Sequence, residues 1–410
     1  MELLNLILTL FGGAILILNV FAAKLQYFSL PAPLLALAFG VFVGPYGLQM
    51  MNLNDFGAHS KTILEEAARV TLGIGLVAVA LRLKHGYWRA NWRWWLAMVT
   101  VGMLIMWAIA TGVLYSLLGL PLLVALLIAA AITPTDPIST TPVVTGPAAK
   151  ENIPERVRQN ISSESGLNDG LAYLFIFLPL LLLTKNSSHA WSEWFTHVLL
   201  WEVMVAIALG AIVGYGLAKL FVFAKKRDYM EETSYFGFMA AMALLLLGGF
   251  KLIGTDAVLA VFIASAVFGQ VVPARDEAQE DKIEDTITRF FIIPVFILLG
   301  IALPINEWSS LGVTALVVVV IALLLRRFLA VWALQPLYKK LHSKAEITFF
   351  SWFGAIGVSA LYYALLAERK TGNSEVFVYV SFAIAVSLLI HGLSTIPLGK
   401  WLKSKSLAKE

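Results

Sequence analysis

Apolar runs long enough to cross a bilayer follow one another along almost the whole 410-residue chain. A membrane-spanning helix needs about 20 mostly apolar residues, and thirteen segments meet this requirement, several with an interruption. Hydrophobic residues make up 59% of the chain, whereas soluble domains lie near about 45–50%. A soluble fold could not bury so much apolar surface, so the sequence predicts an all-α polytopic membrane protein.

The charged residues and the absence of cysteine narrow the classes of function. The formal net charge is +4, and the basic residues lie mostly in short loops between the apolar runs, as at the cytoplasmic face of a membrane rather than in a nucleic-acid-binding protein. No cysteine is present, which excludes disulfides and Cys-based metal sites. The first run lacks a basic n-region and a cleavage site, so it is expected to be a retained helix. The predicted segments are 3–23, 31–48, 64–83, 94–119, 121–145, 162–184, 197–223, 235–252, 255–273, 287–303, 309–335, 346–367 and 376–399.

The distribution of Lys and Arg among the loops predicts the orientation. Thirteen helices place the two termini on opposite sides of the membrane. If the N-terminus is outside, 22 of the 30 basic residues lie in inside segments. The outside loops hold five basic residues, Lys61, Lys185, Lys251, Arg369 and Lys370. The remaining three, Arg69, Arg326 and Arg327, lie within predicted helices. The positive-inside rule therefore predicts a multi-pass protein of the cell inner (plasma) membrane with a cytoplasmic C-terminus.

The odd helix count also predicts internal symmetry. Two six-helix halves joined by one linking helix must have inverted topology, a common plan among secondary transporters. The fifth and twelfth segments correspond in such a plan, and both are interrupted. Segment 121–145 contains Thr133-Pro134-Thr135-Asp136-Pro137, and segment 346–367 contains Gly354-Ala355-Ile356-Gly357. We therefore expect two inverted six-helix repeats with broken crossing helices, although the second break has no proline.

Asp136 lies inside the first of these breaks. Prolines at positions 134, 137 and 142 cannot continue a regular helix, because each removes an N–H and clashes with the preceding turn. In hydrocarbon the freed carbonyls need a partner, which an ion or water in a protein-lined cavity can provide. A structural Asp in a kinked helix is the alternative. An acidic residue at a break near the membrane centre favours a functional role.

Segment 162–184 carries two carboxylates, Glu164 and Asp169, close to its predicted start. Asp169 could be a helix-entry residue favoured by the N-terminal dipole. However, Ser162 and Ser163 are the better candidate caps, and Asp169 lies about two turns further in. Carboxylates inside a spanning helix are costly unless they are paired or used. We therefore predict that Asp169 binds a proton and a cation alternately, since a hard cation such as Na+ prefers oxygen ligands.

Arg326 and Arg327 lie in the apolar segment 309–335. They could extend to the inner surface with their charged ends in water. The apolar residues continue beyond them to Pro336, however, which places the pair below the surface. A buried arginine needs a carboxylate, and Glu164 needs a cation. The sequence therefore favours a Glu164–Arg327 ion pair.

Other charged or polar residues in the apolar segments are weaker candidates. Asp256 is expected at the start of a helix, and His391 as a hydrogen-bonded polar residue rather than a proton relay. Glu65, Glu66 and Arg69 have the spacing of an amphipathic helix end, with an ion-entry role as the less favoured alternative.

The Thr135-Asp136-Pro137 break followed by Glu164-Ser165-Gly166-Leu167-Asn168-Asp169 resembles the monovalent cation/proton antiporters, in particular the NhaP-like Na+/H+ branch, over essentially the whole chain. The resemblance implies Na+ ligands at Thr135, Ser165 and Asp169, with Asp136 beside the site. It also implies a structural Glu164–Arg327 pair, because Arg327 matches the arginine of the family in this helix. The Asn168-Asp169 pair implies electroneutral exchange of one ion for one proton.

The resemblance further implies a homodimer in which a core bundle moves past a dimerisation bundle by alternating access. The dimerisation bundle would comprise residues 1–90 and 231–306, and the core bundle residues 91–190 and 307–410 with a short basic tail. Residues 191–230 would form the linker helix. The substrates would be Na+, or Li+ or K+, and H+, in contact with membrane lipid and without a cofactor or a nucleic-acid partner.

Two positions depart from the family pattern. The second break has Ile356 where the family often has arginine, so selectivity does not follow from the resemblance. Phe328 follows Arg327 where proline is common, which predicts a straighter helix. The alternatives are a K+/H+ antiporter and a Na+-coupled organic-anion transporter of related inverted-repeat fold. A channel would not need a titratable carboxylate beside a broken helix, and no sequence pattern of an intramembrane enzyme is present, so we expect a non-enzymatic transporter.

Overall fold

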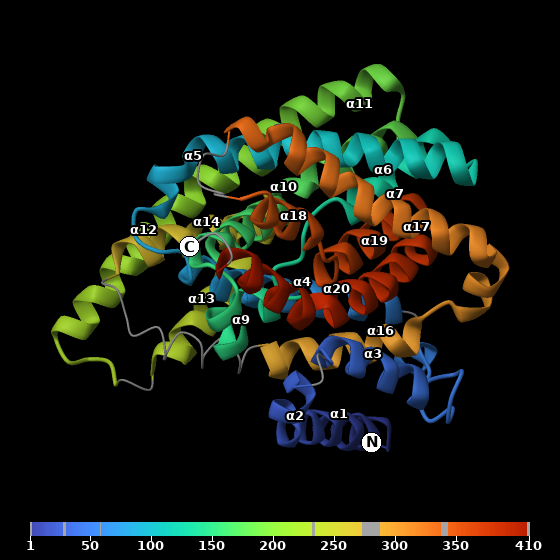
Figure 1. Cartoon of the computed structure of the whole chain (residues 1–410), viewed down its shortest axis with the longest axis horizontal. Helices are drawn as coiled ribbons and strands as arrows, with labels where there is room; N and C mark the ends of the chain where they lie inside the picture. The colour runs from blue at the N-terminus through green and yellow to red at the C-terminus, as the bar shows by residue number, and fades with distance from the viewer. Residues whose placement is uncertain are drawn as a thin grey trace.

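The computed structural model describes residues 2–27, 30–57, 59–231, 234–272, 288–337 and 343–407. Within these residues it contains helices, turns and bends but no β-strand, so the predicted all-α fold is confirmed. Helices α1 and α2 lie along one edge of the molecule and α11 along the opposite edge (Figure 1). The ends of the predicted segments at positions 273 and 287 lie outside the described residues.

The helices of the first half run from α1 to α10. They are α1 Glu2–Val20, α2 Ala22–Tyr27, α3 Ala32–Val43, α4 Ser60–Leu81, α5 Tyr87–Ala97, α6 Met103–Leu118, α7 Leu122–Ile132, α8 Thr141–Val144, α9 Gly146–Asn152 and α10 Glu155–Thr184. A π-helical segment, Met98–Gly102, joins α5 to α6, and a short 3-10 turn covers Leu53–Phe56.

The helices of the second half run from α11 to α20. They are α11 Ser187–Glu193, α12 Val205–Lys226, α13 Ser234–Leu252, α14 Ala257–Val271, α16 Ile293–Ala302, α17 Ile305–Leu334, α18 Lys344–Trp352, α19 Val358–Thr371 and α20 Glu375–Leu407. The π-helical segments Trp194–Met204 and Thr288–Ile292 precede α12 and α16, and a 3-10 turn, Gln335–Leu337, follows α17.

Six helical stretches among the described residues are long and apolar enough to cross a membrane. They are Glu2–Val20, Ala90–Leu118, Glu155–Thr184, Ser187–Lys226, Ile305–Leu337 and Glu375–Lys405. Five further apolar helices have 10–17 residues, among them α3, α7 and α14. The chain is therefore a multi-pass membrane protein. Helix length alone does not establish thirteen membrane-spanning segments, because several of the predicted segments are short or broken.

Several helices extend beyond the predicted boundaries. The predicted start of segment 162–184 was wrong: α10 begins at Glu155, directly after Pro154, so Ser162 and Ser163 lie inside the helix and do not cap it. Similarly, α20 continues to Leu407, beyond the predicted end at 399. The apolar run marks only the part of a helix that suits hydrocarbon. Polar residues with adequate helix propensity continue the same helix past that part.

Both predicted helix breaks are present. The first separates α7 from α8, and the second separates α18 from α19. The two non-helical segments touch, because the Asp136 backbone N–H donates to the Ala355 carbonyl at 2.8 Å. As the missing proline predicted, α17 runs without interruption through Phe328, and its one non-helical residue is Gly312 at φ 70°.

Two glycines bring α10 close to α14. A Cβ at Gly166 would overlap the Phe262 ring, and a Cβ at Gly170 would overlap Leu259. Because these glycines are four residues apart, they lie on one face of α10. Close packing on this face fixes the position of the intervening residues 168 and 169 against the neighbouring helices.

Candidate functional site

Asp136 is held at the contact between the two breaks. It is completely buried, and its Oδ1 accepts a hydrogen bond from the Ile138 N–H at 3.1 Å. Its Oδ2 accepts from the Ser139 hydroxyl at 2.7 Å and from the Val358 N–H at 2.9 Å. Val358 is the first residue of α19, so the carboxylate lies at the positive end of that helix. These contacts satisfy an anionic carboxylate without a cationic side chain.

The second break approaches Asp136 so closely that a side chain at residue 357 would displace its neighbours. A Cβ at Gly357 would overlap both Asp136 Oδ2 and Ser139 Oγ. The neighbouring Ile356 N–H donates to the Ser387 hydroxyl of α20 at 2.9 Å. The second break is therefore held from two sides, by the first break and by α20.

Asp169 lies about four turns inside α10, as the fifteenth residue of that helix. It is completely buried, and neither of its carboxylate oxygens has a hydrogen-bond partner. Ser359 of α19 is close enough to influence the carboxylate, and its hydroxyl likewise has no partner within hydrogen-bond distance. Beyond the hydrogen bonds of the helix itself, the backbone carbonyl of Asp169 accepts a hydrogen bond from the Tyr363 hydroxyl at 2.6 Å. An unpartnered buried carboxylate is costly in hydrocarbon unless it binds a proton or a cation.

Glu164 and Arg327 form a bidentate contact between α10 and α17. Arg327 Nη1 lies 2.5 Å from Glu164 Oε1, and Nη2 lies 2.6 Å from Oε2. Arg327 also donates to the Phe350 carbonyl at 3.0 Å and lies over the Phe350 ring. Both side chains are buried, so snorkelling to the inner surface does not describe Arg327.

Thr135 and Asn168 connect this ion pair to the first break. The Thr135 N–H donates to Asn168 Oδ1 at 3.2 Å, and its hydroxyl accepts from Arg327 Nη1 at 3.0 Å. Asn168 Nδ2 lies 3.5 Å from Glu164 Oε1. Asn168 therefore satisfies a backbone group that the break frees. Ser165, also completely buried, donates to the Ser162 carbonyl at 3.3 Å.

The predicted site residues thus fall into two hydrogen-bonded groups and two separate side chains. Thr135, Asn168, Glu164 and Arg327 form one group, and Asp136 with the second break forms the other. Neither Asp169 nor Ser165 is hydrogen-bonded through its side chain to the rest of the predicted set. The assignment of these residues to ion binding stays a prediction.

Arg326 lies at the crossing, the place where the two helix breaks meet, and the sequence did not predict its contacts. It is completely buried and donates to the Thr133 carbonyl at 2.6 Å and to the Gly354 carbonyl at 2.8 Å. One sequence signal pointed to it: two adjacent arginines lie in an apolar segment, and Glu164 is expected to pair with only one of them. The second arginine then needs other acceptors, and broken helices expose carbonyls.

Three weaker candidates are also placed by the structure. Asp256 caps the start of α14 through bonds from the Val258 and Leu259 N–H groups, which confirms its expected position. Arg69 pairs with Glu66 in α4 at 2.7 Å. His391 Nδ1 lies 2.9 Å from the Ser387 hydroxyl.

Glu65 of α4 binds a residue of a distant helix. Its carboxylate pairs with Arg369 of α19 at 2.7 and 2.8 Å. It therefore connects α4 to α19, whereas its neighbour Glu66 is paired within α4.

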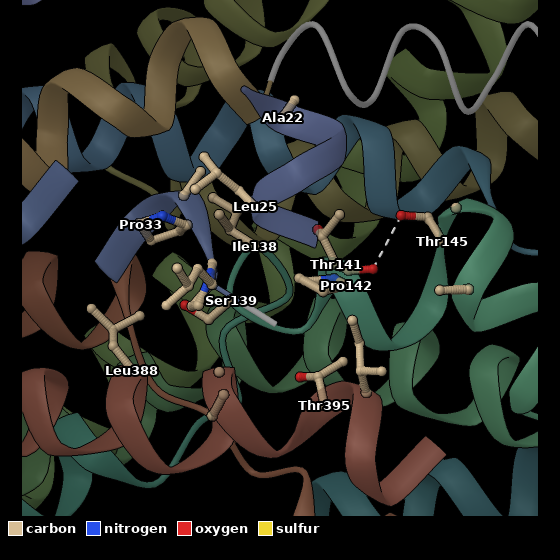
Figure 2. A pocket seen from close by; sticks show the side chains of 18 of the residues that line it. Ala22, Leu25, Pro33, Ile138, Ser139, Thr141, Pro142, Thr145, Leu388 and Thr395 are labelled. Atoms are coloured by element: carbon tan, nitrogen blue, oxygen red, sulfur yellow. Dashed lines mark hydrogen bonds between the residues drawn. The ribbon is translucent and has the colours of Figure 1, made fainter. Parts of the chain in front are cut away.

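A cavity of about 360 Å³ reaches the edge of the crossing. Ala22 and Leu25 of α2 and Pro33 of α3 line one side, and Leu388 of α20 lines another (Figure 2). Ser139, which donates to Asp136, also lines this cavity. The cavity therefore leads from the end of the helices near α2 and α9 to within one side chain of the Asp136 carboxylate.

The described residues contain no cluster of three or more His, Asp or Glu side chains of the kind that holds a resident metal ion. The buried oxygen atoms at the crossing come instead from single carboxylates, hydroxyls and freed carbonyls. Such a donor set suits a weakly held alkali cation better than a transition metal.

Comparison with known proteins identifies the family. The sequence model of the transmembrane sodium/hydrogen exchangers matches residues 7–401. A Na(+)/H(+) antiporter of Schizosaccharomyces pombe is 30% identical over 394 residues, covering 90% of this chain and 84% of that protein. The K(+)/H(+) antiporter NhaP2 of Shewanella sp. ANA-3 is 24% identical, covering 89% of this chain and 61% of that one.

Three further relatives are longer, and the chain spans 45%, 50% and 41% of their lengths. Among solved structures, the sodium proton antiporter MjNhaP1 of Methanocaldococcus jannaschii shares the fold with a TM-score of 0.72. It is 21% identical, and the match covers 98% of this chain and all of that one. The chain therefore belongs to the sodium/hydrogen exchanger family, which consists of secondary transporters and not of enzymes.

Proposed function

We propose that this chain exchanges one monovalent cation, Na+ or Li+, for one proton, and that both substrates bind in turn to Asp169. The observation that carries this proposal is the Asp169 carboxylate, completely buried in the middle of α10 with no hydrogen-bond partner for either oxygen. A carboxylate in such surroundings gains stability by binding a proton or a cation. Members of the family need no cofactor, because the cation and the proton are the substrates.

The neighbouring oxygen atoms favour a hard cation as the second substrate. Ser165 lies one turn before Asp169 on α10, and the Thr135 hydroxyl lies at the break. Each hydroxyl oxygen already makes one hydrogen bond and keeps a lone pair for an ion. Asp169, Ser165 and Thr135 would thus be the Na+ ligands, because hard cations prefer oxygen.

Charge at the crossing supports one-for-one exchange. Asn168 is neutral, and the charge of Glu164 is balanced by its ion pair with Arg327, so Asp169 is the carboxylate of α10 that a cation would neutralise. Asp136 accepts three hydrogen bonds at the start of α19, which stabilise its ionised form. Each half-cycle would then carry one positive charge. The structure also favours the alternative role of Asn168, in which it hydrogen-bonds the backbone, but that role leaves the count of titrating groups unchanged.

The cavity beside Ser139 supports access from one side at a time. Residues 91–190 and 307–410 would form a core bundle that moves past residues 1–90 and 231–306, with 191–230 as the linker. Two inverted six-helix repeats would relate the broken fifth and twelfth helices. We propose that the protein is a homodimer in the plasma membrane. The excess of Lys and Arg in the predicted inside loops supports an N-terminus on the outside. In this orientation the cavity opens to the cytoplasm.

A K+/H+ exchanger is the second candidate, favoured by the similarity to the K(+)/H(+) antiporter NhaP2. A larger cation would use the same oxygen atoms. Position 356 holds isoleucine where the family often has arginine, so the cation selectivity of the family is not carried over to this chain. Coupled transport of an organic anion would need a basic binding site in the cavity. Among the residues that the structure describes, the cavity lining is apolar or hydroxylic and includes no Lys or Arg.

The proposal is tested by dissipation of a pH gradient in proteoliposomes, with Na+, Li+ and K+ added in turn. Wild type should respond to at least one alkali cation. Asp169→Asn should respond to none, because an amide cannot exchange a proton for a cation. Asp228→Asn is the matched control, since Asp228 is exposed at φ 54°, a conformation that Asn tolerates. Undiminished exchange by a folded Asp169→Asn variant would sink the assignment.

A further inference from the structure

Two further carboxylates, those of Glu202 and Asp256, lie together away from the helix breaks. Asp256 directly precedes α14, and its backbone N–H donates to the Glu202 carbonyl at 3.0 Å. Its side chain also lies within range of the Glu202 charge. Glu202 belongs to the π-helical segment Trp194–Met204, and π-helical backbone is rare and often found at functional sites. We call these two acids the Glu202–Asp256 pair.

Each carboxylate of the pair keeps one buried oxygen atom without a hydrogen-bond partner. Asp256 is 1% exposed, and its Oδ1 accepts from the Val258 and Leu259 N–H groups at 3.0 and 3.1 Å. Its Oδ2 has no partner, and neither has Glu202 Oε2. An unpartnered buried carboxylate oxygen is costly, and two neighbouring carboxylates repel each other unless a cation or a proton lies with them.

The basic side chains around the pair do not supply that positive charge. In the described part of the chain, no Lys or Arg forms an ion pair with either carboxylate. His197 Nε2 lies 3.5 Å from the other oxygen of Glu202, Oε1, and the histidine side chain is 55% exposed. Lys251 acts on both carboxylates, and Lys370 on Glu202, from beyond ion-pair distance. The second negative charge is therefore left for a bound cation or proton to balance.

Tyrosine side chains lie between the pair and Asp169. Tyr173 follows Asp169 by one turn on the same face of α10 and lies within range of the charges of both carboxylates. Tyr363 of α19, whose hydroxyl binds the Asp169 carbonyl, lies within range of the Asp256 charge. In the proposed orientation the C-terminal end of α10 and the start of α14 face the outside. The pair then lies between Asp169 and the outside, and the cavity beside Ser139 lies on the cytoplasmic side.

We propose that Glu202 and Asp256 form a second cation site, which an alkali cation occupies on its way between Asp169 and the outside. This inference rests on the proposed function and adds to it a site on the outer route. Carboxylate oxygens are ligands that a hard cation prefers. In the proposed division of the chain, Glu202 belongs to the linker helix and Asp256 to the dimerisation bundle, so neither moves with Asp169. The site therefore concentrates cations at the outer face and leaves one-for-one exchange unchanged.

The test is the KM for Na+ on each face of the membrane, measured as dissipation of a pH gradient in right-side-out and in everted membrane vesicles. The vesicles come from cells that lack other cation/proton exchangers, and another alkali cation replaces Na+ if wild type prefers it. Asp256→Asn removes the charge and keeps the helix cap, because asparagine caps a helix as well as aspartate does. It should raise the outer-face KM on the order of tenfold, since an acidic site raises the local cation concentration. The cytoplasmic-face KM should not change.

Glu202→Gln should have the same effect, and it keeps the test decisive if Asp256→Asn does not fold. Glu307→Gln is the matched control, because Glu307 is an exposed acid in the first turn of α17, whose start also faces the outside in the proposed orientation. Charges in solvent are screened, so this variant should keep both KM values.

An unchanged outer-face KM in either folded variant would overturn the inference, and it is the result expected if the two carboxylates share a proton and bind no cation. A rise in KM that is equal on both faces, or confined to the cytoplasmic face, would overturn it as well. Absence of exchange by wild type with every alkali cation would instead overturn the proposed function, and this inference with it.

Discussion

The Glu164–Arg327 contact gives the sharpest prediction about what stabilises the crossing. Two charge-assisted hydrogen bonds, at 2.5 and 2.6 Å, join side chains that are both buried. Breaking a buried pair by removing one partner costs about 3–5 kcal/mol, because the other charge is left uncompensated. We therefore expect Arg327→Met to lower the free energy of unfolding by an amount in this range.

The two single variants should differ, because their partners keep different contacts. Among the described residues, Glu164 without Arg327 keeps one hydrogen bond, from Asn168 Nδ2 at 3.5 Å. Without the charge of Glu164, Arg327 keeps the Phe350 carbonyl, the Phe350 ring and the Thr135 hydroxyl. Glu164→Gln should therefore cost less than Arg327→Met. The double variant should cost about 1–3 kcal/mol less than the sum of the single ones.

The assay is equilibrium unfolding in mixed detergent–SDS micelles, followed by the fluorescence of the 12 tryptophans. Lys403→Met is the control, because Lys403 pairs with Glu151 at 2.8 Å at the surface, where the two side chains are 39% and 68% exposed. Exposed pairs contribute little to stability, so this variant should show no measurable change. Additive losses in the double-mutant cycle, or a larger loss from Glu164→Gln, would refute this account of the pair.

Two further predictions follow from close contacts at and near the crossing. Gly357→Ala should lower exchange at least tenfold, because its Cβ would overlap Asp136 Oδ2 and displace the carboxylate; Gly248→Ala, where a Cβ meets no atom within 4 Å, should retain exchange in the same proteoliposome assay. Arg369→Gln should lower the unfolding free energy by about 1–3 kcal/mol, because it leaves Glu65 buried without a cation while Arg369 itself is 43% exposed. Exchanging the two charges, Glu65→Arg with Arg369→Glu, should recover part of that loss, and no recovery would argue against the pair.

The sequence predicted the features that depend on local chemistry. Three prolines at positions 134, 137 and 142 were enough to locate the first break, because proline cannot continue a helix. Two arginines and a glutamate in apolar runs were enough to predict an ion pair, since buried charges need partners. The glycines at 354 and 357 located the second break, where α18 and α19 are indeed separated.

The remaining features depend on how distant segments meet. The bond from Arg326 to Thr133 joins residues 193 positions apart, and the bond to Gly354 joins α17 to the second break, so no local pattern predicts them. The bond from Val358 to Asp136 is of the same kind. The start of α10 at Glu155 was missed for another reason: hydropathy marks the buried part of a helix and not its polar first turns.

The central claim is that one proton and one monovalent cation exchange at Asp169 without net movement of charge. Solid-supported-membrane electrophysiology under a Na+ gradient, or a gradient of the preferred alkali cation, tests this claim most directly. A fluorescence assay on the same proteoliposomes must show that the protein is active. We expect active wild-type protein to give no sustained transport current, because each half-cycle carries the same charge. A sustained cation-driven current would contradict one-for-one exchange at a single carboxylate.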